Sequence, residues 1–121
     1  TAPGHETLDH HNAVLGCLRR GGLSLEMAAH AYAVLDSYVY GFALEEAHLP
    51  GGGGDELAVA ADELLAALPR DIYPYLFEFT AEHALQPGYS FGKSFEFGLD
   101  LLINGLHEAA QKAAQRAAPG A

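Results

Sequence analysis

The sequence predicts an all-α fold, a helical bundle of about five helices, and three observations lead to this prediction. Alanine, leucine and glutamate are abundant, whereas β-branched residues are scarce. Apolar residues recur with the helical spacing i, i+3, i+4 and i+7 in several windows, and the strict alternation typical of strands is absent. Prolines and glycine pairs separate these windows, as expected for helix ends: Gly21-Gly22, Pro50, Pro69 and Pro87-Gly88.

The first two helices have clear boundary signals. The first is expected from about Thr7 to Arg20, and it ends at a glycine pair. The second follows Ser24, a good N-cap residue, and runs to about His48, where Pro50 stops it. Such a helix is long for a domain of this size.

Three further helices complete the bundle. Gly51–Gly54 is expected to be a flexible linker, because four glycines cannot contribute side chains to a core. The helices that follow are expected at Asp55–Leu68, Asp71–Leu85 and Ser90–Ala117. The 121 residues, 12.8 kDa in mass, are enough for one domain, which we assign to residues 1–121.

The charge balance excludes several classes of function. Sixteen acidic and six basic residues give a formal net charge of −10, and the basic residues are scattered. Free-standing nucleic-acid binders and proteins of anionic membrane surfaces need clustered Lys and Arg, so neither class fits. No apolar run is long enough to span a membrane. Cys17 is a single cysteine, which favours a reducing compartment, the cytoplasm, and we expect its thiol to be buried.

The last helix carries more apolar surface than one neighbour can cover. It is apolar over more than half its circumference from Phe91 to Leu106. Two glycines seven residues apart on one side either admit a helix of a second copy or relieve crowding inside the monomer. We expect a homodimer whose interface includes the last helix, with these residues in contact: Phe95, Gly98, Leu99, Leu102, Gly105 and Leu106.

The second helix also carries polar side chains among apolar ones. Tyr32 and Asp36 lie one turn apart on one face, and Ser37 follows. A few polar groups in an apolar pocket between helices are typical of a small-molecule site. The alternative is a set of tyrosines half-buried at an interface, with their hydroxyls in water.

Two stretches of the chain resemble the C-terminal domain of the tetracycline repressor (TetR) family. The first comprises Gly22–Glu26 together with Tyr32 through Gly41-Phe-Ala-Leu-Glu-Glu46. The second is Phe95–Leu106, which keeps the pattern Phe-x-x-Gly-Leu-x-x-x-x-x-Gly-aliphatic. The resemblance covers roughly residues 5 to 110 and is specific at these two blocks.

The resemblance implies an effector-binding and dimerisation domain of a one-component transcription regulator, in most cases a repressor. In the family, a small-molecule effector binds the C-terminal domain, and a helix-turn-helix domain binds operator DNA. We expect that DNA-binding domain to lie outside residues 1–121. In the family, the second and last helices of two copies form an intersubunit four-helix bundle, which implies that Tyr38 and Phe42 of the second helix also lie in the expected interface.

The resemblance also implies positions for effector contacts. Glu45 matches the glutamate through which the tetracycline repressor holds drug-bound magnesium, and Ser37 and Val14 stand at two drug-contacting positions. Neither residue is the one found in that repressor, so a tetracycline–magnesium site is not expected. We expect no metal, no cofactor and no catalytic residue. The expected ligand-binding residues are His10, His11, Val14, Tyr32, Asp36, Ser37 and Glu45.

Alternatives remain for several of these residues. His10 and His11 belong to a polar segment that is otherwise read as an exposed helix start. Glu45 is otherwise a solvated carboxylate near a helix end. The domain as a whole is otherwise a dimerisation module without a ligand. A small helical enzyme is a third hypothesis, which lacks any recognisable nucleophile or acid–base pair.

Overall fold

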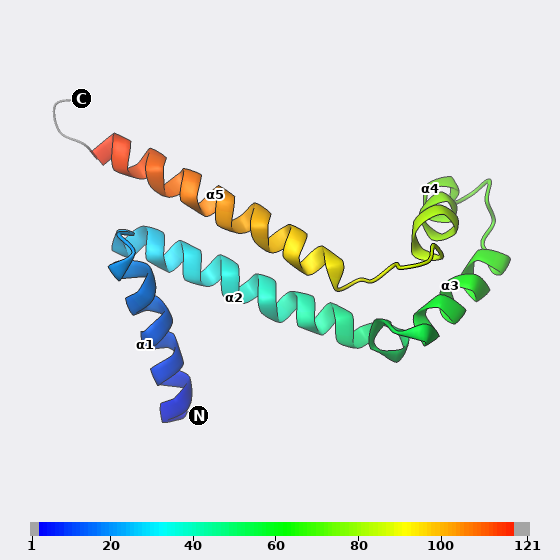
Figure 1. The fold of residues 1–121 in the computed structure, drawn as a ribbon, viewed down its shortest axis with the longest axis horizontal. Coiled ribbons are helices and arrows are strands. Elements are labelled where there is room, and N and C mark those ends of the chain that lie inside the picture. Colours follow the sequence, from blue (N-terminus) through cyan, green and yellow to red (C-terminus); the bar gives the residue numbers. More distant parts are fainter. Residues whose placement is uncertain (1–2, 118–121) are drawn as a thin grey trace. The chain divides into compact units, whose positions relative to one another are not determined.

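The chain is all-α, as predicted, and its helices match most of the expected boundaries. A computed structural model describes residues 3–117, and within that range there is no β-strand. Five α-helices follow one another (Figure 1): α1 His5–Arg20, α2 Leu25–His48, α3 Asp55–Ala67, α4 Pro74–Phe79 and α5 Lys93–Ala117. None of the described helices is both long and apolar enough to cross a membrane.

The chain divides into two compact units. We call residues 1–40 and 98–121 the terminal unit, and residues 41–97 the central unit. The terminal unit contains α1, the first two thirds of α2 and most of α5. The central unit contains the end of α2, α3, α4 and the first turn of α5. The assignment of residues 1–121 to one domain stays a prediction.

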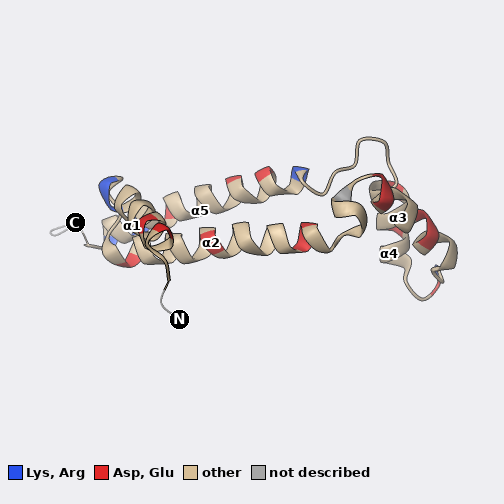
Figure 2. Cartoon of the chain, turned by 90° about the horizontal axis from the view of Figure 1, so that it is seen from below, with Lys and Arg blue, Asp and Glu red and all other residues tan. Residues whose placement is uncertain are grey.

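In the terminal unit, α2 and the later part of α5 run side by side in opposite directions (Figures 1 and 2). At one end of this pair, the phenol ring of Tyr38 covers Gly98 so closely that a Cβ there would lie 2.8 Å from the ring carbon Cζ. At the other end, Met27 lies across a shallow groove from Ala110 and Ala113. Gly98 therefore has a packing reason within one chain, which is the second of the two explanations for its presence.

The core of the terminal unit is made of small side chains. Ala28 and Ala31 of α2 are buried, whereas α1 and α5 contribute no buried residue. Alanine lets helix backbones approach closely but removes little apolar area from water. Among the described residues, no large side chain is fully buried. Packing within the chain therefore removes only a small part of its apolar surface from water.

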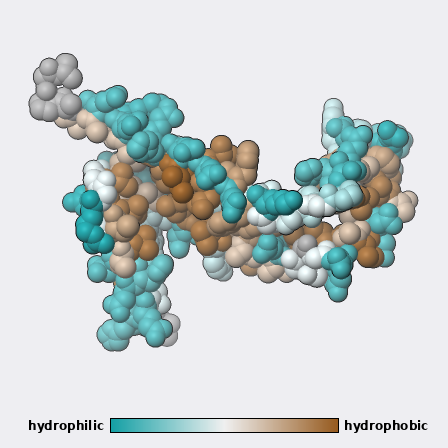
Figure 3. All heavy atoms as spheres, viewed as in Figure 1, coloured by the Kyte–Doolittle hydropathy of each residue, from teal (hydrophilic) through white to brown (hydrophobic). Residues whose placement is uncertain are grey.

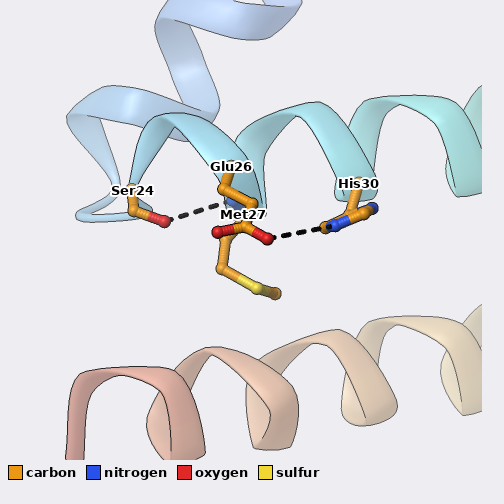
Figure 4. Close-up of polar contacts among 4 residues, drawn as sticks. All are labelled: Ser24, Glu26, Met27 and His30. Atoms are coloured by element: carbon orange, nitrogen blue, oxygen red, sulfur yellow. Dashed lines mark hydrogen bonds and ion pairs between the residues drawn. The ribbon is translucent and has the colours of Figure 1, made fainter. Parts of the chain in front are cut away.

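The start of α2 is fixed by the predicted cap (Figure 4). The Ser24 Oγ accepts a hydrogen bond of 3.1 Å from the Met27 backbone N–H. One turn later, the Glu26 carboxylate lies 3.8 Å from the His30 ring nitrogen, an exposed pair that is ionic only when the histidine is protonated. The cap satisfies one of the backbone donors that every helix leaves free in its first turn.

Replacing Ser24 by alanine should lower the free energy of unfolding by about 1 kcal/mol, because the Met27 N–H loses its acceptor. Denaturant unfolding followed by circular dichroism measures this change. Ser24→Asp keeps an acceptor at the same position and should retain most of the stability. Equal losses in the two variants would show that the cap contributes nothing.

The central unit is held by a cluster of aromatic rings. Phe42, in the last turns of α2, stacks on Phe91 with ring centroids 4.6 Å apart and an interplanar angle of 21°. The edge of the same ring meets Phe95 of α5 at 5.2 Å. Offset-stacked and edge-to-face rings of this kind are the favoured geometries for aromatic pairs. The cluster therefore ties the end of α2 to the start of α5.

Two predicted helices are shorter than expected. The sequence predicts a helix over Asp71–Leu85, but Asp71 and Ile72 form a turn, α4 begins at Pro74, and Thr80–Ala84 is a π-helical turn. Thr80 is buried, and its hydroxyl donates a hydrogen bond of 2.8 Å to the Leu76 carbonyl. Such back-bonding bends a helix and accompanies the irregular turn. The last helix begins at Lys93 rather than Ser90, so Phe91 precedes it.

The glycine run, for which the sequence predicts a flexible linker, forms a turn between α2 and α3. The Gly52 backbone N–H donates a hydrogen bond of 2.9 Å to the Leu49 carbonyl, and the backbone is not helical at Gly51 and Gly52. Gly51 and Gly52 have φ values of 62° and 67°, in the left-handed region that side-chain-bearing residues avoid. At Gly51 a Cβ would also lie 2.7 Å from the Cβ of Glu56. The run is thus a tight connection that requires glycine at two positions.

Figure 2 shows how the charged residues are distributed along the chain. Acidic residues occur on all five helices, whereas Lys and Arg are few and form no patch along any one of them. The prediction of a buried Cys17 is wrong: the residue is exposed. Cys17 lies on α1, and none of the residues of this helix is buried.

Candidate functional site

Two of the predicted ligand-binding residues meet where α1 packs on α2. The rings of His11 and Tyr32 form an edge-to-face pair, with centroids 5.4 Å apart and an interplanar angle of 69°. The His11 Nδ1 and the Tyr32 hydroxyl are both shielded from solvent, and neither makes a hydrogen bond. Buried polar atoms are nearly always paired in folded proteins, so two unpaired ones on neighbouring rings require an explanation. We refer to them as the His11–Tyr32 pair.

The other predicted ligand-binding residues do not join this pair. His10 is exposed, with its ring 6.1 Å from that of His11, and Val14 is half-buried on the next turn of α1. Asp36 and Ser37 are exposed on α2, and Glu45 is exposed in the central unit. The structure therefore gathers part of the expected set, and the assignment of the remaining residues to an effector site stays a prediction.

The acidic and histidine side chains do not converge. Within residues 3–117, no group of three His, Cys, Asp or Glu residues is placed to hold a metal ion. In the described part of the terminal unit, every Asp, Glu, Lys and Arg is exposed. The His11–Tyr32 pair thus lies in a region without buried formal charge.

A second feature is an apolar face on the α2–α5 pair of the terminal unit. An open groove of about 520 Å³ is lined by Ala33, Val34, Ser37 and Tyr38 of α2 and by Leu102 of α5. Beside Leu102, the Leu101 side chain is 60% exposed. A Cβ at Gly105, one turn further along the same side of α5, would meet no atom within 4 Å. Figure 3 shows apolar surface along these two helices. We call this surface the α2–α5 face.

The predicted interface residues divide into two groups. Tyr38, Gly98, Phe42 and Phe95 each have a neighbour within the same chain, as described above. Leu99, Leu102 and Leu106 are half-buried, and Gly105 is exposed. Whether any of them meets a second copy stays a prediction. Val34 and Leu101, which the sequence-based list omits, are exposed apolar residues of the α2–α5 face.

Both omissions have a sequence signal. Leu101 is four residues before Gly105, so the two share a side of the helix, and Val34 stands four residues before Tyr38. The contact between His11 and Tyr32 also has a signal in the sequence. His11, Val14, Leu15 and Leu18 follow the spacing i, i+3, i+4, i+7, which places the histidine in the apolar stripe of α1.

Comparison with known proteins gives one match. No curated protein and no solved structure matches the chain. Residues 1–110 match the family model described as "Tetracyclin repressor-like, C-terminal domain". The match covers most of the chain, including α1, the α2–α5 pair and the central unit. The chain therefore belongs to the tetracycline repressor-like C-terminal domain family, whose members are domains of transcription regulators.

Proposed function

We propose that this chain is the effector-binding and dimerisation domain of a TetR-like transcription regulator, acting as a repressor in the cytoplasm. Its partners are a second copy of itself and a small-molecule effector. Operator DNA is contacted by a helix-turn-helix domain outside residues 1–121. The main support for the proposal is the exposed apolar α2–α5 face. Membership of the family is the reason to interpret this face as a dimer interface.

Dimerisation is supported by the composition of the α2–α5 face. Two of its apolar side chains, Val34 and Leu101, are 39% and 60% exposed, and Gly105 leaves room for an approaching helix. A two-fold axis across this face brings two α2–α5 pairs together as a four-helix bundle. Such an arrangement removes from water the apolar surface that one chain cannot cover.

Effector binding is supported by the unpaired polar atoms of the His11–Tyr32 pair. An effector that binds one arrangement of the helices better than another shifts the population toward it. Because binding and conformation are thermodynamically linked, the same shift changes the affinity of attached DNA-binding domains for an operator. In this scheme the chain carries out no covalent chemistry.

At micromolar concentration the chain should be a dimer of twice its 12.8 kDa mass, as measured by multi-angle light scattering or sedimentation equilibrium. The dimer should persist in 1 M NaCl, because an apolar interface is not screened by salt. A monomer mass at micromolar concentration overturns the proposal. A dimer that dissociates in high salt contradicts the assignment of the interface to the apolar α2–α5 face.

A further inference from the structure

We infer that the effector is an uncharged molecule with an aromatic or aliphatic body and a hydroxyl or carbonyl group, and that this group binds the His11–Tyr32 pair. The inference rests on the proposed function and adds the chemical class of the ligand. It starts from the two unpaired polar atoms, His11 Nδ1 and the Tyr32 hydroxyl, which face no hydrogen-bonding partner in the chain.

The polar group of the ligand follows from what the two atoms can do. The tyrosine hydroxyl donates one hydrogen bond and also accepts, and a histidine Nδ1 donates or accepts according to its tautomer. A hydroxyl group on a ligand can therefore pair with either atom. A carbonyl oxygen pairs with whichever of the two donates. Each such bond satisfies a buried polar atom, which gives the ligand a gain that a purely apolar molecule lacks.

The absence of charge on the ligand follows from the surroundings. A buried ion requires a counter-charge, because desolvating it alone is costly. The described Arg and Lys side chains of the terminal unit are exposed. Arg19 is engaged with the Leu23 carbonyl at 3.2 Å, and Lys112 pairs with Glu108 at 3.0 Å. The carboxylates of the unit are exposed as well, so no side chain with a permanent charge is buried beside His11 as a partner for an ionic ligand.

The apolar body follows from the neighbours along both helices. On α2, Ala28 lies one turn before Tyr32 and is buried, and Leu35 is half-buried on the next turn. On α1, Val14 and Leu15 follow His11 by one turn and are half-buried. Aliphatic side chains around a few polar groups are the usual lining of a small-molecule site.

Binding requires α1 to move slightly, because the two polar atoms are shielded from solvent in the unliganded chain. The helix is suited to such a movement: none of its residues is buried. Elements with few buried contacts open at low free-energy cost. Entry of the ligand thus displaces α1 relative to α2.

The test uses p-cresol and toluene, which share an aromatic body and differ by one hydroxyl group. Isothermal titration calorimetry at millimolar probe concentration should show p-cresol binding at least about tenfold more tightly than toluene. The imidazole ¹⁵N resonances of His11 should shift on addition of p-cresol and remain unchanged with toluene. Equal affinity for the two probes, or no binding of p-cresol, overturns the inference.

Tyr32→Phe separates a ligand-binding hydroxyl from a structural one. It should leave the melting temperature of the unliganded chain unchanged or raised, since the hydroxyl has no partner to lose. The affinity for p-cresol should fall about tenfold. Tyr40→Phe is the matched control, because Tyr40 lies on the same helix with 70% exposure, and it should change neither quantity.

A Tyr32→Phe chain that melts lower and binds p-cresol normally would show that the hydroxyl is structural, which overturns the inference. Should that variant fail to fold, the ¹⁵N shift of His11 in the unsubstituted chain decides the question. The oligomeric state is measured independently. A dimer that binds no p-cresol overturns this inference alone, whereas a monomer overturns the proposed function.

Discussion

Leu101→Asp should convert the dimer into a monomer at micromolar concentration. Leu101 is 60% exposed within the chain, so its replacement should leave the fold of the monomer intact. Two-fold symmetry introduces the carboxylate twice into one apolar interface, where it has no counter-charge. The dissociation constant should rise at least about 100-fold, equivalent to about 3 kcal/mol. Sedimentation velocity over a concentration series measures the change.

Val59→Asp is the matched control, because Val59 of α3 is 59% exposed but lies in the central unit. Its dimer should be unchanged. Gly105→Leu tests the same face by adding bulk where a Cβ meets nothing in the chain, and overpacking should weaken the dimer by about 1–3 kcal/mol. Gly98 is unsuitable for this purpose, since Tyr38 of the same chain fills its Cβ position. Equal dimerisation of the Leu101 and Val59 variants would place the interface elsewhere.

Phe42→Ala should lower the free energy of unfolding by about 2–3 kcal/mol, less than a fully buried phenylalanine because the ring is only half-buried. The substitution removes both the stack on Phe91 and the edge contact with Phe95. The melting temperature should fall by about 10 °C, as measured by differential scanning calorimetry at a fixed protein concentration.

Tyr75→Ala is the control for this prediction. Tyr75 of α4 is 85% exposed, and its loss should change the stability by no more than about 0.5 kcal/mol. Similar losses in the two variants would contradict the structural role of the aromatic cluster. A loss at Phe42 that grows with protein concentration would instead assign the ring to the dimer interface, as the sequence predicts.

The helix boundaries that the sequence predicts well are those with a local cause. Ser24 caps α2, and Gly21-Gly22 ends α1, because the capping bond and the glycine conformations involve neighbouring residues only. The predicted start of the last helix, Ser90, is wrong by three residues, because a contact between residues distant in sequence is involved there. Phe91 continues the apolar pattern of the helix, but its ring is held by Phe42, distant in sequence.

The candidate site shows the same division. Tyr32 and His11 are individually recognisable as polar residues among apolar ones, but their pairing depends on how α1 crosses α2, which no local pattern specifies. Gly98 and Gly105 look equivalent in sequence, seven residues apart on one helix. Only the position of the Tyr38 ring distinguishes them: it covers Gly98, whereas Gly105 has no neighbour within the chain that a Cβ would meet.

The alanine core of the terminal unit has a consequence for the lifetime of the protein in a cell. Among the described residues, the buried apolar ones are Ala28 and Ala31 of this unit and Ala61 of the central unit, so the chain gains little stability from its own packing. In the proposed dimer, association of two copies would supply much of the folding free energy, and that contribution would depend on concentration. Newly made chains that have not yet paired open more often and are exposed to proteases. The regulator would thus set its own minimum concentration, since only paired chains persist.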